Sequence, residues 1–214
     1  MNPLAPTVEA RTALHEATHA VVGYRLGQPF SLVTIIPRGE TGGHIEFEGK
    51  LKDKTDTLRF CIAMLAPLLR CASVEPEPVR TAVLLRGRNE LFGNEFGLNE
   101  LPQPEQAEAA MALVRTITPV LDEFNYALGC NDDLKEVKRE AKYSCGCEDE
   151  LTEFLTDTWQ QADVFTNDSA TRRMIERVAT ALIERRTLDY GDVISLCCDD
   201  GTSDSEGRTA NEMV

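Results

Sequence analysis

The sequence contains few basic residues, few histidines and no long apolar run. Its 22 lysines and arginines are outnumbered by 36 aspartates and glutamates, and the resulting net charge of −14 disfavours contact with nucleic-acid phosphates. No stretch approaches the roughly 18 to 20 apolar residues of a membrane-spanning helix, and the first residues do not resemble a signal peptide. We therefore expect a cytoplasmic protein that binds neither nucleic acid nor membrane.

Two common binding motifs are also missing. The chain has no Gly-x4-Gly-Lys-Ser/Thr phosphate loop, so we expect no ATP hydrolysis by that route, and any motor partner would be a separate chain. The seven cysteines form no Cys-x-x-Cys pair of the kind found in structural zinc sites, and we expect most of them to be reduced thiols. The isolated Cys145-Gly146-Cys147 stretch leaves a metal-binding or disulfide role open.

The composition predicts one soluble globular domain followed by a short tail. Hydrophobic residues make up 42% of the 214 residues and charged residues 27%, which is typical of a protein with a buried core. The segment from Cys197 onward is polar and acidic. We therefore predict a domain over residues 1–196 and a disordered tail over residues 197–214.

One stretch of the sequence indicates a specific chemistry. Apolar residues recur at helical spacing between Val8 and Leu26, and Gly27 follows as a helix-ending residue. On such a helix, His15 and His19 lie one turn apart on one face, so both imidazoles can bind a single metal ion, and Glu16 lies beside them. This His-Glu-x-x-His pattern is the zincin arrangement, although it also occurs by chance in helices with partly buried histidines.

The residues after this helix resemble one family of zinc proteases. Val33-Thr34-Ile35-Ile36-Pro37-Arg38-Gly39 and Gly42-Gly43-His44-Ile45-Glu46-Phe47 are similar to two strands of the peptidase domain of the FtsH family of ATP-dependent zinc proteases. The resemblance covers about residues 10–47 and returns weakly at residues 187–193. Thr18 departs from the family, which has glycine there, and the ATPase part of the family is absent.

The resemblance implies a fold and a function. The fold would be mainly α with a small β-sheet, a zincin-like peptidase domain of the FtsH type. The protein would be a zinc-dependent endopeptidase acting on proteins or peptides without ATP, with Zn²⁺ on His15 and His19 and with Glu16 as the general base. The alternatives are an inactive binding or regulatory module and a protease that cleaves one specific partner. A separate ATPase partner and a homo-oligomer both remain open.

The third zinc ligand is the least determined part of this interpretation. In the family it is a carboxylate early in a later helix, and here Glu105 begins such a predicted helix, although a helix start favours a carboxylate in any case. Glu100 and then Glu95 are the next candidates. Asp168 lies in a similar Asn-Asp context, but its place in the chain favours a helix cap. We expect His44 to line the cleft rather than bind the metal.

Hydrophobic periodicity predicts the remaining elements. Residues 30–37 and 43–49 are expected to form a β-hairpin. We read residues 79–103 as mostly loop with one short helix, and residues 132–143 as a charged, solvated helix. Further helices are predicted at residues 57–74, with a kink near Pro67, and at residues 104–128, 150–164 and 169–186.

Overall fold

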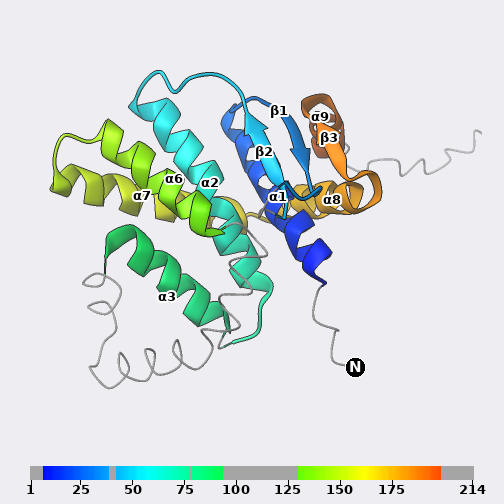
Figure 1. Ribbon diagram of the computed structural model, residues 1–214, viewed down its shortest axis with the longest axis horizontal. Helices are drawn as coiled ribbons and strands as arrows, with labels where there is room; N and C mark the ends of the chain where they lie inside the picture. Colours follow the sequence, from blue (N-terminus) through cyan, green and yellow to red (C-terminus); the bar gives the residue numbers. More distant parts are fainter. Residues whose placement is uncertain (1–6, 39–41, 78, 94–129, 199–214) are drawn as a thin grey trace, which may run out of the picture.

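A computed structural model describes residues 7–38, 42–77, 79–93 and 130–198. Within these residues the protein is mainly helical with one small sheet, as the sequence predicts (Figure 1). The elements in chain order are α1 (Val8–Leu26), β1 (Phe30–Thr34), β2 (His44–Phe47), α2 (Lys54–Val74), α3 (Val79–Phe92), α6 (Cys130–Ser144), α7 (Glu148–Asn167), α8 (Ser169–Arg185), β3 (Thr187–Asp189) and α9 (Tyr190–Cys198).

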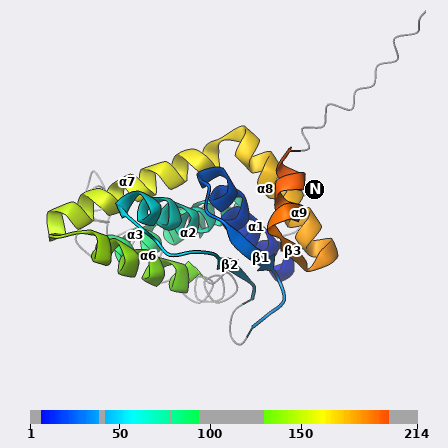
Figure 2. The same ribbon diagram turned by 90° about the horizontal axis from the view of Figure 1, so that it is seen from above.

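Helix α1 is the centre of the molecule, with α2 packed on one side and α8 on the other (Figure 2). The helix begins after Thr7, whose Oγ1 accepts a hydrogen bond from the Ala10 amide at 3.2 Å. It ends at Gly27, which adopts the left-handed conformation with φ 72° that glycine tolerates best. Most of its middle is buried, so the predicted metal-binding residues lie inside the fold.

Helix α2 packs against α1 and also against α3, α6 and α7. It begins three residues before the predicted start, after the capping residue Asp53, and continues through Pro67. Among the described helices it is the one that is long and apolar enough to cross a membrane by composition alone. However, 67% of that apolar window is buried inside the molecule, which is typical of a core helix.

The prediction of mostly loop after α2 is wrong for residues 79–92, which form the 14-residue helix α3. The glycine that suggested a loop, Gly87, is buried against α2. A Cβ added there would lie 2.4 Å from the Leu68 Cδ2 atom and 3.6 Å from Trp159. The glycine therefore marks a close approach between helices, which a local pattern does not distinguish from a turn.

The sheet is three-stranded and antiparallel, in the order β2-β1-β3. Strands β1 and β2 confirm the predicted hairpin, with Val33 paired to Ile45. Strand β3 was not predicted as a strand: its three residues place Leu188 opposite Val33. One apolar core surrounds α2, and another lies between the sheet, α1, α8 and α9. Strand β2 is at one edge of the sheet.

The C-terminal helices agree with the sequence pattern to within a few residues. Helices α7 and α8 match the predicted segments closely, and α9 extends to Cys198, two residues into the predicted tail. Helix α6 was predicted to be solvated, but one face of it is buried through Cys130, Leu134, Val137 and Ala141. All seven cysteines are free thiols, Cys145 and Cys147 among them. The predicted helix at 104–128 and residues 199–214 lie outside the described residues.

Candidate metal centre

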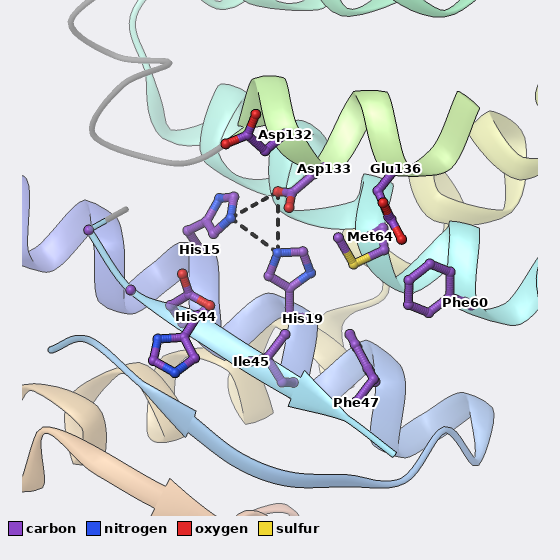
Figure 3. A pocket seen from close by; sticks show the side chains of 13 residues that line it. His15, His19, His44, Ile45, Phe47, Phe60, Met64, Asp132, Asp133 and Glu136 are labelled. Carbon is purple, nitrogen blue, oxygen red and sulfur yellow. Dashed lines mark hydrogen bonds and ion pairs between the residues drawn. The ribbon is translucent and has the colours of Figure 1, made fainter. Parts of the chain in front are cut away.

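The two histidines of α1 converge on one point, as their spacing predicts. His15 and His19 are each only 2% exposed, and their Nε2 atoms lie 3.1 Å apart (Figure 3). The helix brings them together because residues four apart lie on the same face, one turn from each other. The pair therefore offers two nitrogen ligands to one ion.

A carboxylate from α6 completes a set of three. The Oδ2 atom of Asp133 lies 3.1 Å from the His15 Nε2 atom and 3.3 Å from the His19 Nε2 atom. Ligands about 2.1 Å from a tetrahedral zinc ion are separated from each other by roughly 3.3 Å, so the three distances fit one such ion. Among the described residues, this is the group of histidine, cysteine, aspartate or glutamate side chains whose ligand atoms come close enough to hold a metal.

The outer nitrogens of the two rings support the same conclusion. The His19 Nδ1 atom lies 3.0 Å from the Ala63 carbonyl oxygen, which can only accept, so Nδ1 carries the proton and Nε2 presents a lone pair. The His15 Nδ1 atom lies 3.8 Å from the Cys130 Sγ atom, and a thiol can donate or accept a hydrogen bond. In this tautomer the Nε2 lone pair of His19 faces the same point as the Asp133 Oδ2 atom, where a metal ion would lie.

Burial and charge shift the pKa values of this group in opposite directions. Burial is the largest single effect on both rings. It lowers the pKa of His15, whereas at His19 the Asp133 carboxylate outweighs burial and raises the pKa. Burial alone would raise the pKa of Asp133, but the two imidazoles outweigh it and bring the pKa to about 2. Asp133 is therefore an anion at neutral pH, as a metal ligand must be.

Glu16 lies beside this triad without belonging to it. Its side chain lines the same cavity, and its Oε2 atom has no hydrogen-bond partner in the described part of the chain. Burial raises its pKa to about 8. Gly43 packs directly against it, since a Cβ added there would lie 2.8 Å from the Glu16 Cγ atom and 2.7 Å from the Thr34 carbonyl oxygen. The residue that leads into strand β2 thus packs directly against the Glu16 side chain.

The triad opens into a cavity of about 400 Å³. Its walls come from α1, the edge strand β2, α2 and α6, and Figure 3 shows Ile45, Phe47, Phe60 and Met64 on one side of the histidine pair. A cavity of this size accommodates water and part of a larger molecule. The metal ligands are therefore accessible from one side although the histidines are buried.

The carboxylate proposed from sequence as the third ligand was Glu105, which lies outside the described residues, as do Glu100 and Glu95. Asp168 is not at the site: it caps α8 through the Thr171 amide at 2.9 Å and pairs with Arg25 at 2.7 Å. His44 lines the cavity, as expected, with its Nε2 atom 3.7 Å from a carboxylate oxygen of Glu46.

Sequence reasoning missed Asp133, although a signal for it existed. The chain contains two Asn-Asp pairs, Asn131-Asp132 and Asn167-Asp168, and only the second was compared with the carboxylate context of the FtsH family. The first pair leads directly into Asp133 and the amphipathic helix α6. Treating that helix as solvated concealed the fact that one of its carboxylates faces inward.

Thr18, the departure from the family pattern, does not crowd the site. Its hydroxyl donates a hydrogen bond to the Leu14 carbonyl oxygen at 2.6 Å, back along α1, and its side chain is fully buried. The histidines on either side of it still converge. A threonine is therefore compatible with the arrangement of the metal ligands.

No known protein family matches the chain, and the curated proteins compared with it include no significant match.

Proposed function

We propose that this protein is a zinc-dependent endopeptidase of the zincin type, similar to the peptidase domain of the FtsH family. The observation that carries the proposal is the convergence of His15, His19 and Asp133 on one point, with Glu16 beside them in an accessible cavity. Two imidazoles and one carboxylate are a common ligand set of catalytic zinc, which keeps a fourth position open.

The three ligands have distinct tasks in this mechanism. His15 and His19 would hold the ion through their Nε2 atoms, and Asp133 would hold it through Oδ2 and balance part of its charge. A bound Zn²⁺ supplies Lewis acidity, which acidifies a water molecule and polarises the scissile carbonyl group. The Ala63 carbonyl keeps the His19 ring in the tautomer that this role requires.

Glu16 would move the proton. Its Oε2 atom lacks a hydrogen-bond partner among the described residues and can accept a proton from the attacking water, then donate it to the leaving amine. Burial favours the protonated form of Glu16, with a pKa of about 8, but a cation at the adjacent triad would lower that pKa. The loaded site would therefore have an ionised base near neutral pH.

The edge strand β2 would bind the peptide backbone. It pairs with β1 on one side only, and residues from Gly43 to Phe47 border the cavity. An extended substrate can add to such an edge through main-chain hydrogen bonds, which are largely independent of sequence. The scissile bond of a substrate in this position would lie beside the metal ligands.

The proposal is tested by metal content and hydrolysis. We expect elemental analysis to show one zinc per chain, and we expect the zinc-loaded protein to cleave an unfolded protein such as casein without ATP. A chelator should abolish cleavage and added zinc should restore it.

Glu16→Gln is the decisive variant, because the amide keeps the shape of the side chain and cannot accept the proton. It should retain zinc and lose activity by about a hundredfold or more. Equal activity of the two proteins would remove Glu16 from the mechanism. Stoichiometric zinc without hydrolysis by the wild type would indicate a binding module instead.

A further inference from the structure

We propose that the cavity beside the metal centre continues into a groove that selects peptides with an apolar residue next to the scissile bond and a lysine or arginine one or two residues further along. This inference rests on the proposed function and names its substrate class. The substrate groove is the surface formed by Ile45, Phe47, Phe60, Met64, Glu136 and Glu140.

The groove is continuous with the metal site. The cavity at the triad and a second cavity of about 350 Å³ share Phe47, Phe60 and Glu136 as lining residues. The second cavity is lined further out by Glu48, Lys50 and Glu140, among others. A peptide that leaves the metal site on this side would therefore pass first over the aromatic rings of Phe47 and Phe60 and then along carboxylates.

The apolar section has two walls. Strand β2 supplies Ile45 and Phe47, two residues apart on one face, and α2 supplies Phe60 and Met64, one helical turn apart. The rings of Phe47 and Phe60 pack edge to face, with their centroids 5.5 Å apart.

The position of the Phe47 ring is fixed by α1. A Cβ added at Gly23 would lie 2.9 Å from the Phe47 Cε1 atom, so the glycine leaves room for the ring to pack closely. Because Phe47, Phe60 and Met64 remain only partly buried, part of this apolar surface is left for a substrate side chain.

The acidic section is a stripe on α6. Glu136 and Glu140 follow Asp133 by three and seven residues, so all three lie along one side of the helix. A rise of 1.5 Å per residue places them about 4.5 and 10 Å from Asp133 along the axis. An extended peptide advances about 3.3 Å per residue, so these carboxylates lie beside the second and third residues from the metal.

The charge of the stripe is only partly balanced within the protein. Arg139 is the cation that bridges Glu136 and Glu140, and it is 56% exposed. One arginine between two carboxylates leaves a net negative charge, while Glu48 and Lys50 in the same cavity balance each other. A basic side chain of a substrate can share these carboxylates or displace Arg139, whereas an acidic side chain would be repelled.

The test measures binding to zinc-loaded Glu16→Gln protein, so that it does not depend on turnover. The probes are fluorescent eight-residue peptides with one leucine in a serine and alanine background. Arginine, glutamine or glutamate stands one or two residues from the leucine, on its N-terminal side in one series and on its C-terminal side in the other. In one series we expect arginine peptides to bind about five- to tenfold more tightly than glutamate peptides.

Four variants test which residues of the groove cause the peptide preferences. Glu136→Gln combined with Glu140→Gln should bring the arginine and glutamate peptides to nearly equal affinity, and Arg139→Gln should increase the preference for arginine. Glu153→Gln is the matched control, because it removes an exposed carboxylate that lines a different surface hollow. Phe60→Ser should reduce the preference for leucine over serine and leave the charge preference intact.

The two proposals fail in different ways. The arginine preference in the Glu16→Gln protein, combined with no hydrolysis by the wild type, would support the groove and overturn the peptidase function. Hydrolysis by the wild type with equal binding of all three peptide classes would overturn the groove and leave the peptidase function standing. An arginine preference that survives in the variant lacking both Glu136 and Glu140 would also overturn the groove proposal, provided that thermal melting shows that the variant is folded.

Discussion

Helices α1 and α6 contribute to the candidate metal site in very different ways. Helix α1 supplies His15, Glu16 and His19 within five residues, so the relative positions of these side chains follow from helical geometry alone. Helix α6 supplies Asp133, 114 residues after His19, and its position depends on how α6 packs against α2. A local motif thus identifies three of these four side chains, whereas the packing of distant helices selects the fourth.

The two histidines of α1 also differ in which neighbouring helix supports them. His19 on α1 is held by a backbone carbonyl of α2, whereas His15 is held by the thiol of Cys130 at the start of α6. Each of the two neighbouring helices therefore orients one histidine ring.

The first prediction compares the carboxylate from α6 with the one expected from sequence. Asp133→Ala removes a metal ligand and should therefore weaken zinc binding by more than about a hundredfold. Loss of a group that only hydrogen-bonds to a ligand typically weakens metal binding by at most about that factor. Glu105→Ala should leave the affinity unchanged. Competition with a chromogenic chelator measures both. The opposite result would return the third ligand to Glu105.

The second prediction tests the support that strand β2 gives to Glu16 on α1. Gly43→Ala places a methyl group against the Glu16 side chain and the Thr34 carbonyl oxygen, and the strand backbone cannot yield easily. We expect hydrolysis to fall about tenfold or more while zinc content stays at one per chain, because a displaced base transfers protons poorly.

The control for this change is Gly191→Ala in α9, where the added atom approaches only a carboxylate oxygen of Asp189, at 3.3 Å. This variant should retain full activity. If Gly43→Ala also retained full activity, the close packing at Gly43 would have no part in positioning the base.

The third prediction concerns Cys130, which supports His15 from α6. Cys130→Val removes the hydrogen-bonding partner of the His15 Nδ1 atom and should weaken zinc binding by about tenfold. Cys130→Ser keeps an acceptor and should stay within a few-fold of the wild type. Chelator competition and the visible spectrum of the cobalt-substituted protein report on the ligand geometry.

Cys61→Val is the matched control for Cys130→Val. Cys61 is also buried, but its Sγ atom donates a hydrogen bond to the Val137 carbonyl oxygen at 3.8 Å and contacts no metal ligand. Equal zinc affinities of the two valine variants would show that Cys130 has only a packing role.

The parts of the fold that the sequence predicts well are those whose signals are local. Thr7 and Gly27 bound α1 closely, and the hairpin of β1 and β2 follows from two β-branched or alternating runs around a short turn. Helices α7 and α8 show their buried faces as clear helical periodicity. In each case the decisive residues lie within about twenty positions of one another.

The parts that the sequence does not predict depend on distant contacts. Strand β3 has only three residues and exists because it pairs with β1, more than 150 positions earlier. Helix α3 contains Gly87, which suggests a loop until Leu68 and Trp159 are seen packed against it. Periodicity does place a helix at α6, but it does not show which of its charged residues face inward.

The local sequence is enough to predict a helix that carries His15 and His19 one turn apart with Glu16 next to them, because the pitch of an α-helix is independent of its surroundings. Which of the chain's 36 acidic residues faces that pair depends on how distant helices pack. A carboxylate becomes a candidate ligand through its position in space, and Asp133 reaches that position because the buried face of α6 packs against α2.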